Sequence, residues 1–253
     1  MSSIYLVNIG ANTSHSARAR SPIFEDGSFV YVPFPTKHPK RGSGYPPDAL
    51  PFVRSASRRC THADPDWKGL SYGDKGSNPR ASSLRRVAIG DILLFWGLLW
   101  RNVGKDWFGF TGARGWYLLG TLRVEEIAEP DQSLQLVSAR NRSRASRNAH
   151  FLNALGVVPK DERIFIGARR YSKRFSRPVD LAVTKPSGIM YMAFTSSRGS
   201  LLSYGTSPSW RSSLRSCRRI WDLRDRSDCS RAEVVRDAIL RSEGFDMLKD
   251  VSP

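Results

Sequence analysis

The sequence predicts an α+β fold: a small, mostly antiparallel β-barrel with helices at its periphery. Residues 92–99 (ILLFWGLL) follow a Gly-Asp turn, and residues 116–124 (WYLLGTLRV) form a second long apolar segment. Consecutive strands usually pair, so these segments are expected to be antiparallel neighbours in one curved sheet. Near the C-terminus, Ser230 and Glu233 match a capping box ahead of apolar residues at helical spacing, which predicts a helix.

The remaining elements follow from shorter patterns. Apolar runs bounded by turn residues predict further strands at residues 4–10, 29–34, 163–168, 179–183 and 189–194. A proline-led segment at residues 79–87 predicts a short helix, and residues 140–151 are expected to be helical in their second half. Residues 35–57 are rich in Pro, Gly and Ser and predict a long surface loop. No repeat or linker divides the chain, so we expect a single domain over residues 1–253.

The composition indicates a folded protein with an anionic partner. Of its 253 residues, 40% are hydrophobic, which argues against wholesale disorder, and the formal net charge is +17. Arginine outnumbers lysine about three to one. Its planar guanidinium binds phosphate through two hydrogen bonds and stacks on bases, so nucleic acid is the expected partner, DNA more than RNA. The alternative is a general arginine bias from a high-GC genome.

The cysteines and the apolar segments indicate a cytoplasmic protein without a membrane span. Three cysteines without CxxC spacing give neither a disulfide framework nor a cysteine zinc site. Cys60 and His62 form only a Cys-x-His pair, so we predict no metal and no cofactor. The N-terminus has no basic leader, and no apolar segment is long enough to cross a bilayer. The sequence also contains no P-loop, GxGxxG, nucleophile elbow or HExxH motif.

The candidate site is a polar loop at residues 61–66 (THADPD) with the following Tyr72-Gly73-Asp74. A histidine titrates near neutrality, and a neighbouring carboxylate fixes its tautomer, so His62, Asp64 and Asp74 are the candidate catalytic residues. Tyr72 is expected to contact the ligand. The alternative is that the aspartates cap turns and that the histidine is merely solvated.

Tryptophan and arginine are the two other residue types that we expect to take part in binding, and each also has a structural interpretation. Trp96 lies in a cluster of tryptophans that suits the flat walls of a base pocket, although a tryptophan in a strand is often a core residue. Arginines outside the loop are expected to contact phosphates without reading sequence, unless they form a solvated basic face. They are Arg142, Arg144, Arg147, Arg170 and Arg174.

Four segments together resemble the bacterial and phage family called nucleotide modification associated domain, type three. They are residues 7–14 (VNIGANTS), residues 21–27 (SPIFEDG) with 32–33, residues 62–74 with their His-Ala-Asp-Pro and Tyr-Gly-Asp ends, and residues 90–97 with 117–120. A Gly-Asp turn before an apolar strand also resembles the barrel of PUA-like domains such as EVE, ASCH and YTH, which accommodate bases.

The resemblance implies a site formed by Asn12, Ser21 and Asp26 together with the loop that carries His62. The function we expect is recognition of a modified or flipped nucleobase in DNA, with Asn12, Ser21 and Asp26 as ligand-binding residues. One alternative is an enzyme at the same pocket, such as a glycosylase, nuclease or base-modifying transferase that uses His62 and an aspartate. A second alternative is a basic adaptor that binds another protein.

Overall fold

The computed structural model describes residues 2–11, 15–36, 44–55, 60–78, 81–151, 156–180, 195–196, 199–200 and 217–251. Its strands are β1 (Ser3–Asn8), β2 (Ser21–Ile23), β3 (Ser71–Lys75), β4 (Ile92–Asn102), β5 (Phe110–Ala128), β6 (Glu162–Gly167), β7 (Lys173–Asp180), β8 (Thr195–Ser196), β9 (Gly199–Ser200) and β10 (Cys217–Asp222). Two α-helices are described, α1 (Ala139–Ser146) and α4 (Arg226–Glu243). The α+β class predicted from the sequence is therefore confirmed.

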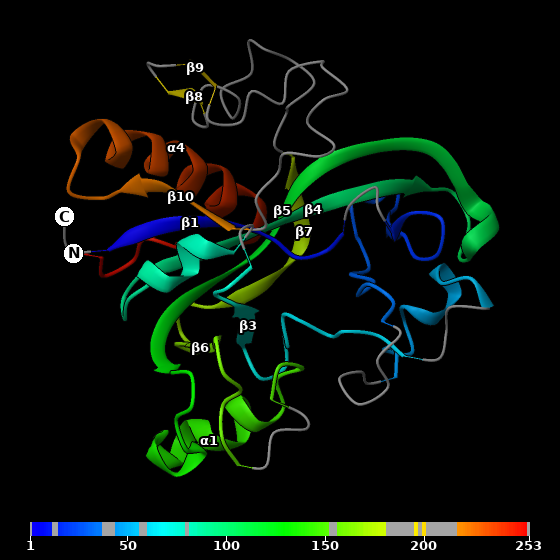
Figure 1. Cartoon of the computed structure of the whole chain (residues 1–253). Coiled ribbons are helices and arrows are strands. Elements are labelled where there is room, and N and C mark those ends of the chain that lie inside the picture. The colour runs from blue at the N-terminus through cyan, green and yellow to red at the C-terminus, as the bar shows by residue number, and fades with distance from the viewer. Residues whose placement is uncertain are drawn as a thin grey trace.

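The main sheet is mixed and open. Its path runs β10-β1-β4-β5-β6-β3, with β2 and β7 paired to β4 and β5 beside that path. The central pair β4 and β5 is antiparallel, as predicted, whereas β1 and β2 run parallel to β4. Among the described strands the path does not close on itself, so the closed barrel predicted from the sequence is not observed. Figure 1 shows β5 as a long curved strand, which pairs with β4 and, further along its length, with β6.

The two faces of the sheet carry different cores because side chains alternate along a strand. Ile4, Leu94 and Trp96 pack on one face with α4, whereas Tyr5 and Phe95 pack on the opposite face with residues before and within β3. The eleven residues of β4 are almost all buried, as expected for a central strand covered on both faces. The candidate site lies at the second of these faces.

The C-terminal helix α4 is confirmed, but it begins four residues before the predicted capping box. Asp225 is its N-cap and accepts hydrogen bonds from the backbone N–H groups of Ser227 and Asp228. The helix ends at Gly244, whose φ of 60° is the left-handed conformation that glycine adopts easily. Figure 1 shows α4 lying across β1 and β10.

The helix α1 occupies the first half of residues 140–151, the reverse of the prediction. It ends at Ser146, and the chain then turns through Asn148 and His150. A small apolar cluster under α1 includes Phe151 and Ile164 of β6, and it holds this turn against the sheet. The polar side chains of Asn148 and His150 are thereby placed beside β3.

Other predicted elements have mixed outcomes. Residues 29–34 form no strand, apart from one bridge between Ile23 and Phe29. The predicted helix at residues 79–87 is a 3-10 turn at Ser82–Arg86. β7 takes up the start of the predicted strand at residues 179–183, and residues 189–194 lie outside the described residues. None of the helices in the described ranges is both long enough and apolar enough to cross a bilayer.

Candidate functional site

The loop before β3 is held in place by its own backbone and by a buried tyrosine. The Tyr31 hydroxyl lies 3.0 Å from the carbonyl oxygen of Ile9 and 2.9 Å from that of Asp64. The backbone N–H of His62 donates to the carbonyl oxygen of Phe34 at 3.1 Å. A cis peptide bond joins Asp64 to Pro65. The hydrogen bonds of Tyr31 and of the His62 N–H anchor the backbone of the loop that carries the His62 and Asp64 side chains.

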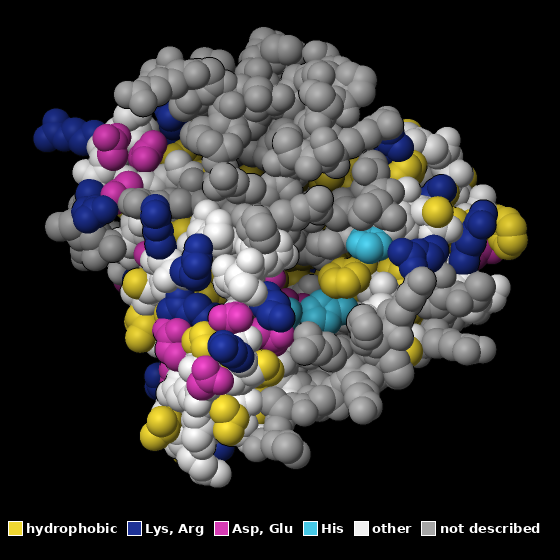
Figure 2. Space-filling model, in the orientation of Figure 1, with side chains coloured by type: hydrophobic (Ala, Val, Ile, Leu, Met, Phe, Trp, Pro, Cys, Tyr) yellow, Lys and Arg dark blue, Asp and Glu magenta, His cyan; other side chains and the backbone are white. Residues whose placement is uncertain are grey.

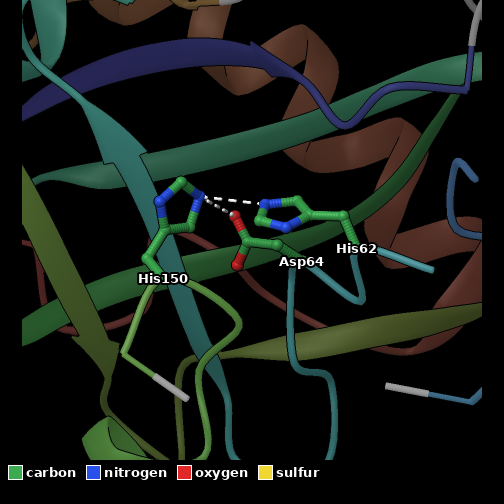
Figure 3. Close-up of side chains that lie close together, drawn as sticks. All are labelled: His62, Asp64 and His150. Carbon is green, nitrogen blue, oxygen red and sulfur yellow. Dashed lines mark hydrogen bonds and ion pairs between the residues drawn. The ribbon is translucent and has the colours of Figure 1, made fainter. Parts of the chain in front are cut away.

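Asp64 is a buried carboxylate, only 3% exposed, with defined donors. The backbone N–H of Gly73 in β3 donates to its two oxygens at 3.1 and 3.2 Å. The Asn148 amide donates to Oδ1 at 2.9 Å and also lies 3.2 Å from the Ser71 hydroxyl. Asp64 Oδ2 faces the ring of His150 at 3.6 Å. Figure 3 shows the carboxylate between two imidazole rings.

His150 is oriented by a second buried carboxylate, Glu162, the first residue of β6. Its Nδ1 lies 3.1 Å from Glu162 Oε2, and Glu162 is 1% exposed. A carboxylate accepts hydrogen bonds, so this contact places a proton on Nδ1. In the neutral ring Nε2 then carries a lone pair. The antiparallel pairing of β3 with β6 brings Glu162 to this position.

Three polar side chains therefore converge at one point. His62 Nε2 lies 3.0 Å from His150 Nε2, and the two rings meet nearly at right angles, with an interplanar angle of 82°. The ligand atoms of His62, Asp64 and His150 all lie within 4.8 Å of one another. Such an arrangement can move protons among its members, and two imidazoles with a carboxylate are also a ligand set for a transition metal.

Gly73 makes this close approach possible. A Cβ added at residue 73 would lie 2.7 Å from Asn148 Oδ1 and 2.7 Å from His150 Cδ2. Both distances are far below van der Waals contact, so any side chain there would displace the turn that carries His150. The glycine of the Tyr72-Gly73-Asp74 segment thus serves the packing of the site.

Burial changes the proton affinities of the cluster. Burial raises the pKa of Asp64 to about 7, although the nearby His150 and the hydrogen bonds from Asn148 and Gly73 oppose that rise. Burial likewise raises the pKa of Asp74, whose Oδ2 accepts a hydrogen bond from the Tyr72 hydroxyl at 2.8 Å. Burial lowers the pKa of His150, but Glu162 and the neighbouring carboxylates outweigh it and leave that pKa above 6.5.

His62 stands at the outer edge of the cluster and continues into a row of rings. The Phe34 ring contacts both histidines of this row. Its centroid lies 5.1 Å from that of His62, and it stacks on the ring of His15 with the centroids 5.2 Å apart. Phe34 and His15 also line a small hollow with Ser21 and residues of β4. Figure 2 shows histidine side chains reaching the surface on this face beside hydrophobic and basic side chains.

The structure separates the predicted ligand-binding residues. The Tyr72 hydroxyl donates to Asp74, next to the cluster. Ser21 lines the same hollow as Phe34, and its hydroxyl accepts a hydrogen bond from the Val32 N–H at 3.0 Å. Asp26 lies in an exposed turn and accepts hydrogen bonds from Ser28. Trp96 is buried against Trp116 in the core on the α4 face of the sheet, which is opposite the face that carries the cluster. Asn12 lies outside the described residues.

The predicted phosphate-binding arginines divide into structural and exposed groups. Arg144 is 4% exposed and donates to the carbonyl oxygens of Gly69 at 2.6 Å and Leu70 at 3.3 Å. Arg142 donates to three carbonyl oxygens of residues 134–137. These two guanidiniums hold the chain together, because backbone oxygens occupy their donors, and we assign them structural roles.

The other three of these arginines remain at the surface. Arg147 lies 3.6 Å from Asp66, with half of its side chain exposed. Arg170 and Arg174 are exposed and lie over the rings of Tyr171 and Phe29. A phosphate contact by any of them stays a prediction.

Sequence reasoning missed His150, Asn148 and Glu162. The only available signal was that residue 150 is one of four histidines in the chain. Its partners are 88 and 12 residues away along the sequence, so no local motif connects them. The prediction of no metal was made without His150, and the cluster now provides three candidate ligands within the described residues.

Comparison with known proteins identifies the family. The family model of Nucleotide modification associated domain 3 matches residues 3–224, which is most of the chain. No curated protein and no solved structure matches the chain significantly. The chain therefore belongs to the Nucleotide modification associated domain 3 family, as the resemblance of its motifs indicated.

Proposed function

We propose that this member of the Nucleotide modification associated domain 3 family binds DNA and acts chemically on a nucleobase at the His62–Asp64–His150 site. The observation that carries the proposal is the convergence of these three side chains, of which the two histidines are partly exposed and Asp64 is buried. A pocket that only reads a base needs shape and hydrogen bonds. It does not need a buried carboxylate whose pKa is raised to about 7, which favours an enzyme over a reader.

The geometry assigns a role to each residue. His62 is the outermost group and is placed to exchange a proton with the base or with an attacking water. Asp64 gains and releases a proton near neutral pH, so it is suited to relay that proton. Glu162 holds the His150 ring so that Nε2 faces His62, and it acts as a positioning residue.

The row of rings beside the cluster is suited to hold a base. Phe34 stacks on His15 at an interplanar angle of 18°, and Phe34 also contacts His62. A base in a duplex must leave the stack before an enzyme can reach its edge, and flat side chains replace the lost stacking. We therefore place the flipped or modified base against Phe34, with its polar edge toward His62.

A cationic and aromatic surface on the β4–β5 hairpin adjoins this row. The Arg20 guanidinium lies between the rings of Trp100, at 4.6 Å from the centroid, and Trp107, at 4.8 Å. Arg114 covers Trp100 at 4.7 Å, and Arg54 covers Trp107 at 5.2 Å. Arg20 and Trp100 also line the hollow that contains His15 and Phe34, so this surface is continuous with the base site.

The positive charge of this surface favours binding of an anion. Burial lowers the pKa of Arg20, and the nearby positive charges of Arg54 and Arg114 lower it further. Within the described ranges, none of the three forms a salt bridge with a carboxylate. A phosphate backbone supplies the missing negative charge, and Phe108, 91% exposed at the hairpin tip, offers a further stacking surface. We propose this surface as the main backbone contact.

The test of chemistry is mass analysis of nucleosides. DNA that carries plain or modified bases is incubated with the protein, digested to nucleosides and compared with untreated DNA. We expect a mass change or base loss with the parent chain, and a loss of at least about 100-fold in rate for His62→Ala and for Asp64→Asn. DNA affinity should stay within a few-fold of the parent, because neither residue belongs to the cationic surface.

The outcome of this test separates the candidate functions. If the parent chain binds modified DNA selectively but alters no nucleoside, the protein is a reader and the enzymatic proposal is wrong. If it neither binds DNA nor alters nucleosides, the adaptor alternative is favoured.

The test of binding uses the salt dependence of affinity. Replacing Arg20, Arg54 and Arg114 with Ala should weaken binding to every sequence and flatten the slope of log K against log salt by about one per lost contact. Arg140→Ala is the matched control, since Arg140 is exposed but lies 3.5 Å from Glu125 on α1's side of the molecule. Equal slopes for the triple variant and the parent would contradict the assignment of this surface.

A further inference from the structure

We infer that His62, Asp64 and His150 bind one divalent first-row transition-metal ion through two imidazole nitrogens and one carboxylate oxygen. The inference concerns the same site as the proposed function and rests on it for the purpose of the ion. With the ion bound, His62 and Asp64 are deprotonated ligands, so the proton-transfer roles given to them above belong to the metal-free site. Metal binding itself is measured without DNA, so either proposal can fail alone.

The spacing of the three ligand atoms carries the first part of the argument. His62 Nε2 and His150 Nε2 lie 3.0 Å apart, and Asp64 Oδ2 lies 3.6 Å from His150 Nε2. Metal–nitrogen bonds of about 2.1 Å place neighbouring ligands roughly 3.0–3.4 Å apart in octahedral or tetrahedral geometry. The remaining pair, His62 and Asp64, has its ligand atoms within 4.8 Å, so side-chain rotations that draw these two residues together would bring all three atoms onto a single ion. Figure 3 shows that both rings and the carboxylate point toward the same place.

The residues behind the ligands carry the second part. A histidine that binds a metal usually donates its other ring N–H to a carboxylate, which fixes the tautomer and strengthens the ligand. Glu162 makes this contact with Nδ1 of His150 at 3.1 Å. Asn148 and the Gly73 N–H donate to Asp64 and fix the carboxylate in the same way. A solvated histidine or a turn-capping aspartate needs none of these partners.

The ligand set indicates the class of ion. Two imidazoles and one carboxylate favour Mn²⁺, Fe²⁺, Co²⁺, Ni²⁺ or Zn²⁺ over Mg²⁺ and Ca²⁺, which prefer oxygen ligands. Three protein ligands leave positions for water or substrate, as catalytic sites require. His62 and His150 are both partly exposed and His62 contacts Phe34, so we place the open positions toward the row of rings.

The experiment measures binding of the metal alone. The protein is stripped with a chelator, dialysed and titrated with Mn²⁺, Co²⁺ and Zn²⁺ by calorimetry, with Mg²⁺ as the comparison ion. We expect one equivalent of a transition metal to bind and Mg²⁺ to bind far more weakly. The visible absorption of bound Co²⁺ reports its ligands without any variant, so this readout holds even where a substitution prevents folding.

Variants identify the ligands. We expect at least about 100-fold weaker binding in His62→Ala and His150→Ala, and about 10- to 100-fold weaker binding in Glu162→Gln, which removes the orienting carboxylate but no ligand. His15→Ala is the matched control for a partly exposed histidine outside the cluster. Cys60→Ser tests the other metal-binding residue near His62 in sequence, and it should leave the affinity unchanged.

Two results would overturn the inference. One is the absence of saturable transition-metal binding by the folded parent chain. The other is binding that survives His62→Ala and Glu162→Gln but is lost in Cys60→Ser or His15→Ala. If the metal binds as expected while no nucleoside is altered, the site is a metal centre and only the proposed function fails.

Discussion

The two faces of the central sheet use their carboxylates in opposite ways. On the α4 face, Glu243 accepts hydrogen bonds from the backbone of residues 176 and 177 and pairs with Lys173 at 2.9 Å, and the hydrogen bonds outweigh burial and lower its pKa. Asp246 pairs with Arg236 at 2.8 Å, which lowers its pKa as well. On the site face, burial raises the pKa of Asp64 and of Asp74.

The carboxylates on the α4 face therefore stabilise the folded state when ionised, whereas those on the site face destabilise it when ionised. A carboxylate with a lowered pKa contributes stability at neutral pH, whereas one with a raised pKa costs stability when it ionises. The Gly73 N–H and the Asn148 amide need an acceptor at residue 64 but no charge, since both already donate to Oδ1 and the single oxygen of an asparagine could accept from both. We conclude that the buried carboxylates of the polar cluster lower the stability of the folded chain when they ionise.

The largest expected loss of stability comes from the α4 face. Glu243→Gln replaces one acceptor oxygen with an amide that opposes the N–H donors of β7, and it leaves Lys173 without its partner. We expect the free energy of unfolding to fall by about 3 kcal/mol. Denaturant titration measures it, and Glu233→Gln, on the exposed face of α4, is the control. Metal binding should be unaffected, so a large loss of metal affinity would argue that the two faces are coupled.

A smaller loss is expected where the site is most tightly packed. Gly73→Ala places a Cβ 2.7 Å from both Asn148 and His150, so the turn after α1 must shift. We expect a destabilisation of about 1–3 kcal/mol together with a loss of metal affinity. Gly44→Ala is the control, because a Cβ there meets nothing within 4 Å. Unchanged metal affinity in a destabilised Gly73→Ala variant would show that the position of His150 is not critical.

The sequence predicted the elements that depend on local patterns. The pairing of β4 with β5 followed from two apolar segments separated by a wide loop, and α4 followed from its apolar periodicity. The helix start was misplaced because Asp225, five residues before the capping box, caps it instead. The closed barrel was not observed because β10 and β3, the two ends of the described path, do not pair with each other. The parallel pairing of β1 and β2 with β4 was also missed, since no hairpin pattern reveals it.

The candidate site was predicted only in half. His62 and Asp64 share one loop, so their proximity follows from the sequence. His150 and Glu162 come from the turn after α1 and from the start of β6, and only the pairing of β3 with β6 brings them close. Arg142 and Arg144 were assigned to phosphate for a related reason. Charge alone does not reveal that Arg144 is buried and that its nitrogens donate within the chain, whereas Arg20 donates one hydrogen bond to the Ser16 carbonyl oxygen and otherwise lies over two tryptophan rings.

Asp64 opposes folding when it ionises, and the pH dependence of unfolding reports this cost. The unfolded chain releases this proton near the ordinary pKa of 3.8, whereas the folded chain holds it to about 7. Between these values the folded state binds the extra proton, so the free energy of unfolding falls as pH rises, by up to about 1.4 kcal/mol per pH unit. The raised pKa of His150 adds to this fall above pH 6.5.

The measurement compares parent and Asp64→Asn by denaturant unfolding from pH 4 to pH 8 in the presence of a chelator. The amide keeps an acceptor for Gly73 and Asn148 and can donate to His150 Nε2, so the variant should fold. We predict that the variant loses most of the downward slope between pH 4 and pH 7 and is at least as stable as the parent at pH 8. Equal slopes in the two proteins, or a variant less stable than the parent at pH 8, would contradict the account.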